Sequence, residues 1–248
     1  MRRLILNFWP VCVLLLLWQI WVSTAGYNSI VLVPPSAVVT DLLRFPAAYL
    51  LPAVHTLTFA LCGLSLGMAA GVLLALAAWR SELLAGVFTP VSLLLSATPI
   101  VCLIPVIARL FGYDSRSELI AIAVMTFFPS FVYGGTGLRR LPAMSQDVFC
   151  VLHASRWQYL RLLALPAALP TLATALRVGA TFSVLVALLA EYLMQTGGLG
   201  ALFAVTMQQF HLARALGASA LAMALSVLLF EATRALEHRV STFYRAGS

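Results

Sequence analysis

The stretch DVFCVLHASRWQYLRLLALPAALP, residues 147–170, decides the fold of this chain. It lies between two strongly hydrophobic spans and alternates apolar with polar positions, as a helix on a membrane or partner surface would. Pro166 and Pro170 follow, and proline is accepted in the first turn of a helix but not deeper inside. The pattern predicts a connecting loop that contains a surface helix, with the next membrane span opening at these prolines.

The composition around this stretch is that of an integral membrane protein. Of the 248 residues, 62% are hydrophobic and 9% are charged, whereas soluble domains carry about 25% charged residues. Crossing a bilayer takes about 20 apolar residues. We therefore expect one all-α polytopic domain over residues 1–248, with about six membrane spans at residues 4–24, 55–79, 83–110, 119–138, 167–194 and 212–236.

The third of these spans contains Pro90, Pro99 and Pro105. Such breaks survive in lipid only where neighbouring groups or water satisfy the freed carbonyls. We expect this span to be kinked or split and to face the bundle interior.

The arginines predict the orientation of the chain. The formal charge of +7 comes from arginine alone, because the chain has no lysine. With the N-terminus inside, ten arginines fall in cytoplasmic segments and three in outer loops, which is the positive-inside pattern. Both termini and the 147–166 loop are then cytoplasmic, and nucleic acid is not expected as a partner. The segment with Arg2-Arg3 and Ser23-Thr24-Ala25 also resembles a signal peptide, but its length and its tryptophans favour an uncleaved helix.

The missing lysine excludes two kinds of chemistry. A phosphate-binding P-loop needs its lysine, and Schiff-base catalysis needs one too. The four cysteines show no Cys-x-x-Cys spacing, so we expect neither a disulfide nor a metal site. No buried nucleophile with a base is indicated, so the chain is expected to be non-catalytic, with no catalytic residues.

The spacing of the 147–166 loop resembles the Glu-Ala-Ala loop of type I ABC importer permeases. Asp147 stands at the Glu position, Val148 and Phe149 at the two alanines, and His153 at the glycine, with Leu-Ala-Leu-Pro at 163–166 after the usual interval. The likeness extends over residues 54–236. Residues 154–158 and the following Ala-Ala-Leu-Pro are similar to the subgroup that handles sulfonates, taurine, nitrate and thiamine precursors.

This resemblance implies partners and a site. It implies a bacterial inner-membrane permease working by alternating access, with ATPase subunits that bind ATP and Mg, a periplasmic binding protein and a second permease subunit. A homodimer is favoured over a heterodimer. The segment 145–166, here called the coupling loop, would contact the ATPase through Asp147, Val148, Phe149, Val151, Leu152, His153, Ala154, Ser155 and Arg156.

The alternative is a secondary transporter that works alone. Such a protein usually carries mid-membrane carboxylates for ion coupling or repeated broken helices. Glu191 and Glu231 stand near the ends of their predicted spans, so that reading is weaker.

Polar residues inside the spans suggest a translocation path. Arg177 is expected to pair with Glu231 or with backbone carbonyls rather than with substrate, although an intramembrane charge is often functional. His55 and His211 are expected to be interfacial polar residues. The candidate path residues are Thr98, Thr126, Ser130, Arg177, Thr181 and Ser183.

Three local features complete the predictions. Gly63, Gly67 and Gly71 form a smooth helix face, suited to packing within one subunit or to a dimer interface. His153 at the glycine position predicts a turn with positive φ, before Ser155 caps the next helix. The resemblance implies a short outer helix within residues 195–211, and residues 197–209 are expected to form part of the gate and of the binding-protein surface.

Overall fold

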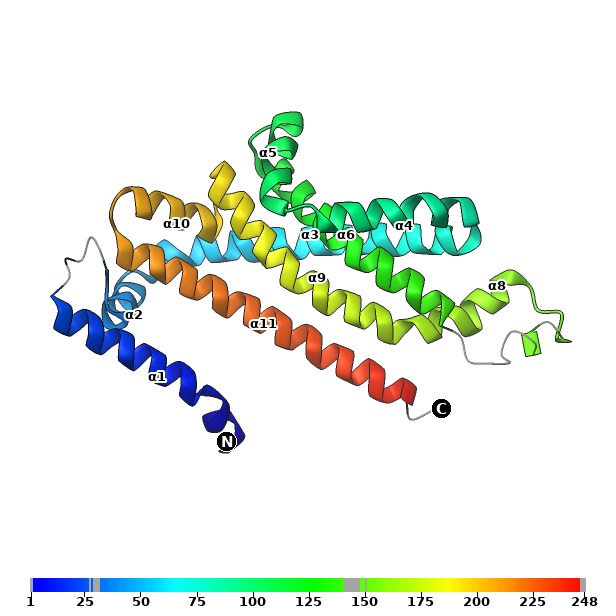
Figure 1. Ribbon diagram of the computed structural model, residues 1–248, viewed down its shortest axis with the longest axis horizontal. Helices are drawn as coiled ribbons and strands as arrows, with labels where there is room; N and C mark the ends of the chain where they lie inside the picture. Colours follow the sequence, from blue (N-terminus) through cyan, green and yellow to red (C-terminus); the bar gives the residue numbers. More distant parts are fainter. Residues whose placement is uncertain (1, 27, 29–31, 141–147, 150, 246–248) are drawn as a thin grey trace.

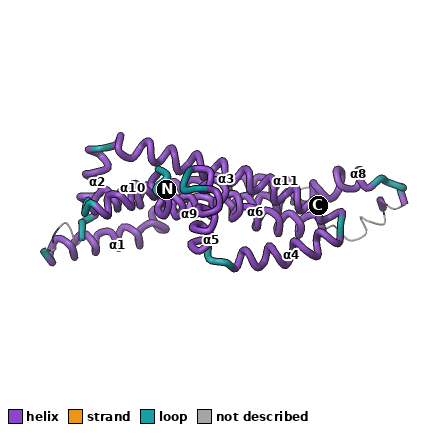
Figure 2. Tube along the Cα trace, turned by 90° about the horizontal axis from the view of Figure 1, so that it is seen from above, coloured by secondary structure: helices purple, strands orange, loops and turns teal. Residues whose placement is uncertain are grey.

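The computed structural model describes the chain except for residues 1, 27, 29–31, 141–147, 150 and 246–248. In the described ranges all regular secondary structure is helical, as the composition predicted. Long helices run along the molecule and shorter ones pack around them (Figure 1). Figure 2 shows the same bundle from above.

Four helices are long and apolar enough to cross a membrane. They run Pro46–Arg80, Ser115–Arg139, Arg156–Met194 and Leu212–Tyr244. They contain α3 (Pro46–Arg80), α6 (Ser115–Arg139), α9 (Leu165–Met194) and α11 (Leu212–Arg245). The last has 34 residues, which is roughly 51 Å at 1.5 Å per residue and exceeds a ~30 Å hydrocarbon layer. The chain is therefore a multi-pass membrane protein.

The predicted third span is two helices. α4 (Glu82–Ala97) and α5 (Ile100–Phe111) are separated at Pro99, whose ring disfavours a helical conformation in the residue before it. Figure 1 shows α5 turned out of the line of α4. The expected split of this segment is confirmed, but the segment 83–110 is not one continuous helix. The expected interior position holds for α5, which buries Ile104 and Ala108 in the core.

Other helix boundaries also differ from the prediction. α1 (Arg2–Ala25) agrees with the first span, and it lies to one side of the bundle in Figure 1. A short amphipathic helix that was not predicted, α2 (Pro35–Arg44), follows it. The second membrane helix begins at Pro46 rather than at 55. Proline occupies the first turn of both α2 and α3, where its missing N–H is not needed.

Small residues bring the central helices together. Gly63, Gly67 and Gly71 of α3 lie against α6. An added Cβ at Gly63 would collide with Ile122, and one at Gly67 with Thr126 and the Ala123 carbonyl. An added Cβ at Gly71 would collide with Ser130 and the Phe127 carbonyl. Close backbone approach across small residues is the usual way membrane helices associate. Of the two predicted roles for this glycine face, the structure shows packing within one subunit.

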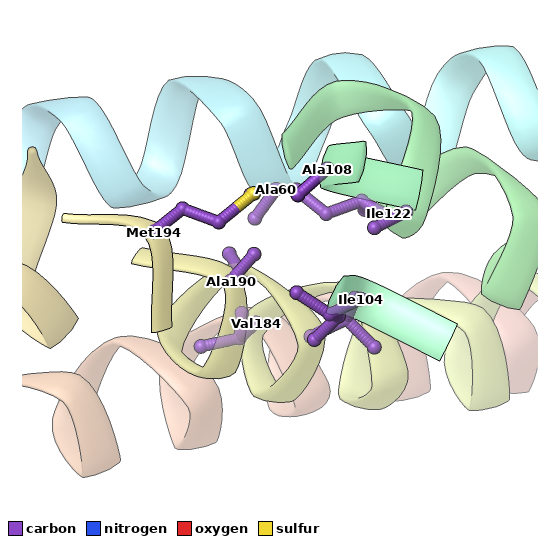
Figure 3. Close-up of a cluster of buried hydrophobic side chains, with 10 residues drawn as sticks. Ala60, Ile104, Ala108, Ile122, Val184, Ala190 and Met194 are labelled. Atoms are coloured by element: carbon purple, nitrogen blue, oxygen red, sulfur yellow. The ribbon is translucent and has the colours of Figure 1, made fainter. Parts of the chain in front are cut away.

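A hydrophobic cluster fills the space between α3, α5, α6 and α9. It contains Ala60, Ile104, Ala108, Ile122, Val184, Ala190 and Met194 (Figure 3). Small alanines alternate with branched side chains, which allows close packing without voids. This core packs α3, α5, α6 and α9 against one another.

Candidate functional site

The coupling loop presents an apolar surface at one end of the bundle. Residues 148, 149 and 151 are helical, while Asp147 and Cys150 lie outside the described residues. Val148, Val151 and Leu152 are all exposed, and Val151 is 78% accessible. Adjacent exposed apolar side chains of this kind mark an interaction surface.

Phe149 has a different environment from these three. Its ring meets Tyr159 edge to face at 5.5 Å between centroids, and Tyr159 stacks on Trp79 at 6.1 Å. The Phe149 side chain is half-buried against aromatic residues of the same chain. The prediction that Phe149 anchors a partner protein is not supported by this placement, because the ring already packs on Tyr159 of the same chain.

These aromatic rings border an open hollow at the same end of the bundle. It is lined by Trp79, Arg80, Phe149, His153, Ala154, Arg156 and Tyr159. The hollow combines aromatic walls with two guanidinium groups. A partner side chain that is apolar or acidic would fit it.

The turn after the coupling helix has the predicted geometry. His153 has φ 46°, and the N–H of Ala154 donates to the Phe149 carbonyl at 3.0 Å. Ser155 caps α8 (Arg156–Tyr159): its hydroxyl accepts from the Gln158 N–H at 3.3 Å, and its own N–H donates to Gln158 Oε1 at 2.8 Å. Positive φ at His153 and capping by Ser155 are both confirmed.

The first testable expectation concerns this turn. Left-handed backbone costs a residue with a side chain about 1–2 kcal/mol, so His153→Gly should keep or slightly raise the melting temperature of the purified chain. His153→Val places a β-branched side chain in the same conformation and should lower it by several degrees. Thermal unfolding in detergent measures both. Equal melting temperatures for the two variants would contradict a role for positive φ here.

The helix after the turn begins earlier than the prolines predicted. α8 continues through η1, a π-helical turn over Leu160–Ala164, directly into α9, so one helix runs Arg156–Met194. The Leu165 N–H donates to the Leu160 carbonyl, five residues back. Pro166 follows immediately, where the ordinary hydrogen-bond ladder is already interrupted. Pro166 therefore lies in the first turn of α9, as predicted, but the continuous helix begins earlier, at Arg156.

Most of the predicted path hydroxyls are used inside the helices. Thr126, Ser130 and Ser183 are fully buried, and each hydroxyl donates to a carbonyl of the preceding turn, at 2.9, 2.8 and 2.9 Å respectively. Such bonds satisfy the hydroxyl without any ligand. These three residues do not line an open path within the subunit. Thr98, just after α4, donates to the Leu94 carbonyl and Thr181 to the Arg177 carbonyl, but neither residue is buried.

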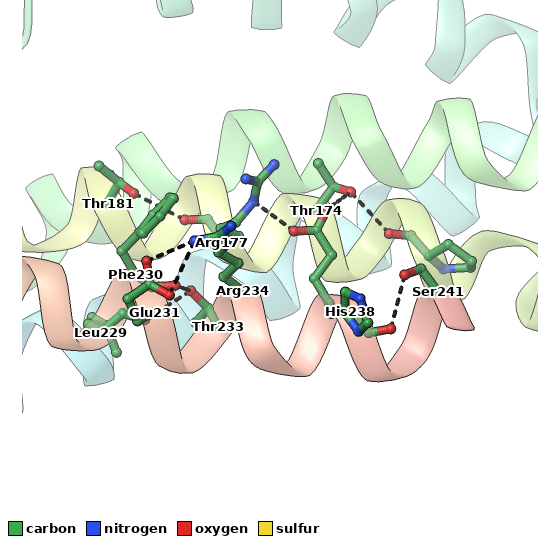
Figure 4. Close-up of polar contacts among 12 residues, drawn as sticks. Thr174, Arg177, Thr181, Leu229, Phe230, Glu231, Thr233, Arg234, His238 and Ser241 are labelled. Atoms are coloured by element: carbon green, nitrogen blue, oxygen red, sulfur yellow. Dashed lines mark hydrogen bonds and ion pairs between the residues drawn. The ribbon is translucent and has the colours of Figure 1, made fainter. Parts of the chain in front are cut away.

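Arg177 pairs with Glu237 of α11 and not with Glu231. Arg177 Nε lies 2.7 Å from Glu237 Oε2, an ion pair without hydrogen-bond alignment, and Thr174 donates to Glu237 at 2.7 Å. Glu231 pairs instead with Arg234 at 3.0 Å. Figure 4 shows polar contacts along α9 and α11, with Thr174, Arg177, Glu231 and Arg234 labelled. The structure thus supports the predicted structural role for Arg177 but with a different partner.

One polar cluster was missed by the sequence analysis. His55 of α3, Glu118 of α6 and Glu191 of α9 meet at the end of the bundle away from the coupling loop. The available signal was Glu191 with Gly197-Gly198-Leu199-Gly200 after it. Gly198 has φ +76°, and an added Cβ would overlap the Glu191 carboxylate, so the glycines make room for this side chain.

Comparison with known proteins places this geometry in a family. Residues 67–242 match the model of the "Binding-protein-dependent transport system inner membrane component". The chain belongs to this family. It is a membrane permease subunit of an ABC importer for a small solute.

Individual relatives agree with the assignment. The formylaminopyrimidine transport permease of Halalkalibacterium halodurans is 25% identical to this permease, covering 91% of this chain and 90% of the relative. The riboflavin transport permease of Chloroflexus aurantiacus is 29% identical to this permease, covering 78% of this chain and 74% of the relative. A crystal structure of an amino acid ABC transporter has the same fold, with a TM-score of 0.68 at 13% identity over 81% of this chain and 97% of that one.

Proposed function

We propose that two copies of this permease form the path of an ATP-driven importer, with two ATPase subunits at the coupling loops. The observation that carries the proposal is the exposed apolar patch of Val148, Val151 and Leu152, next to the His153 turn and the Ser155 cap at one end of the bundle. A small, rigidly mounted apolar helix is suited to a groove in a partner protein.

The arginine distribution supports a cytoplasmic position for this patch. Arg80, Arg139, Arg156 and Arg161 all stand at the coupling-loop end of their helices. The positive-inside rule assigns that end to the cytoplasm, where an ATPase would meet it. Both termini would then be cytoplasmic, and the membrane would be the bacterial inner membrane.

The opposite end would receive the binding protein. α10 (Gly198–Gln208) follows α9 there as a short helix, after a turn with positive φ at Gln195 and Gly197. We propose α10 as part of the gate and docking surface. Among the solutes in the predicted subgroup, we favour a pyrimidine related to thiamine precursors, because the formylaminopyrimidine permease of Halalkalibacterium halodurans aligns with 91% of the chain.

Reconstitution tests this proposal against the lone-transporter alternative. The permease is placed in proteoliposomes alone or with an ABC ATPase and a periplasmic binding protein from the same organism, and uptake of labelled formylaminopyrimidine, taurine and nitrate is measured. We expect uptake of one of these solutes only with all components and ATP. Uptake by the permease alone under a proton or sodium gradient would overturn the proposal.

A further inference from the structure

Three side chains from three helices converge at the bundle end away from the coupling loop. Glu118 and Glu191 are fully buried, while the His55 side chain is 25% exposed. His55 Nδ1 lies 3.4 Å from Glu191 Oε1 and 4.0 Å from Glu118 Oε1. One donor atom of each residue lies within 4.8 Å of the others.

The second oxygen of each carboxylate is held by the protein. Glu191 Oε2 accepts from the Thr56 hydroxyl at 3.0 Å and from the Gly200 N–H at 2.8 Å. Glu118 Oε2 accepts from the Thr196 hydroxyl at 2.6 Å. Such bonds orient ligand groups around metal ions. They leave the two Oε1 atoms directed toward His55.

One of these two atoms is buried and has no hydrogen bond. Glu118 Oε1 has no partner among the residues that the structure describes. Buried carboxylates are normally paired or bind metals, because an unpaired buried charge is costly. Within the described residues, His55 is the basic group within 4.0 Å of the pair. Two carboxylates facing one imidazole leave room for a further positive charge.

We propose that His55, Glu118 and Glu191 bind a divalent transition-metal ion of the zinc type. One imidazole nitrogen and two carboxylate oxygens are common zinc ligands, at about 2.0–2.2 Å. A tetrahedral ion keeps such ligand atoms about 3.3–3.6 Å apart. The His55–Glu191 distance of 3.4 Å matches this spacing, and the Glu118 carboxylate at 4.0 Å needs a small closing movement. The exposed edge of His55 supplies the route of entry.

The site would join α3, α6 and α9 at one point. It does not depend on the transport role, so its test is a binding measurement. The full chain is purified in detergent with an affinity tag free of histidine, stripped with EDTA and titrated with Zn²⁺. We expect one tightly bound ion per chain by mass spectrometry of the metal, and a rise in Tm of about 5 °C or more at saturation.

Variants assign the ion to these residues. Glu118→Gln keeps an acceptor for Thr196 and should weaken Zn²⁺ binding by at least about tenfold, as should His55→Gln at its partly exposed position. Glu231→Gln and His211→Gln, which remove the same types of group elsewhere, should bind Zn²⁺ like the native chain. If Glu118→Gln fails to fold, His55→Gln and the visible spectrum of the Co²⁺-loaded chain decide the assignment.

Several results would overturn the site. One is a native chain that neither retains Zn²⁺ nor changes its Tm. Another is a His55→Gln variant with native affinity and an unchanged Co²⁺ spectrum. An equal Tm rise with Mg²⁺, which imidazole ligands do not favour, would show a general salt effect and would also count against the proposal.

Discussion

Replacing Gly67 with valine is expected to abolish accumulation of folded permease. An added Cβ at this position would overlap Thr126 Oγ1 and the carbonyl oxygen of Ala123 on α6. The obstructing carbonyl belongs to the backbone of a packed helix and cannot rotate away. Overpacking a core typically costs about 1–3 kcal/mol, and this contact should cost about 3 kcal/mol or more. Size-exclusion profiles of a fluorescent fusion and thermal unfolding of the purified chain measure the loss.

Gly86 provides the matched control in the same protein. It is also a helical glycine, but a Cβ at Gly86 would meet nothing within 4 Å. Gly86→Val should fold normally, and Gly86→Ala should be neutral or stabilise the chain by up to about 1 kcal/mol. A Gly67→Val variant with the yield and Tm of Gly86→Val would show that α3 and α6 are not as close as described.

The second large effect is expected at Val151, where aspartate should detach the ATPase. Val151 is the most exposed of the apolar coupling residues, at 78%, so its replacement leaves the permease core intact. A charge in a desolvated interface costs several kcal/mol when unpaired. We expect loss of ATPase co-purification and of ATP-driven uptake, with an unchanged Tm of the permease alone.

Position 149 is a poorer probe of the same contact. Phe149 packs on Tyr159, so Phe149→Asp would also damage the loop itself. Leu43 is 77% exposed on α2, far from the loop, and Leu43→Asp tests whether any exposed charge has the same effect. Loss of the ATPase in Leu43→Asp, or its retention in Val151→Asp, would remove the support for this interface.

Features encoded by neighbouring residues could be predicted from the sequence. The proline at 99 breaks the third span through its own backbone chemistry. The turn at His153 was expected because this residue stands at the glycine position of the family pattern, two residues before the Ser155 cap. In each case the deciding interactions lie inside one turn of chain, and the structure confirms them.

Contacts between helices were not predictable in the same way. Glu231 and Glu237 are six residues apart, about 9 Å along a helix, and only the register between α9 and α11 selects Glu237 for Arg177. The sequence also does not show whether a serine or threonine faces a path or a neighbouring helix. For this reason the buried Thr126, Ser130 and Ser183 were included among the path residues. The cluster of His55, Glu118 and Glu191 could be predicted only if the relative positions of α3, α6 and α9 were all known.

The π-helical turn over Leu160–Ala164 has a mechanical consequence for the helix Arg156–Met194. That helix has 39 residues, about 58 Å of length at 1.5 Å per residue. Pro166 and Pro170 have no N–H to donate to the preceding turn, and residues 160–164 form a π-helical turn. The helix should therefore bend most easily between Leu160 and Pro170. Beyond Pro170 the rod has a full set of backbone bonds to resist bending. Displacement of the coupling loop would therefore bend the helix close to that loop, and the segment after Pro170 would move as a rigid body.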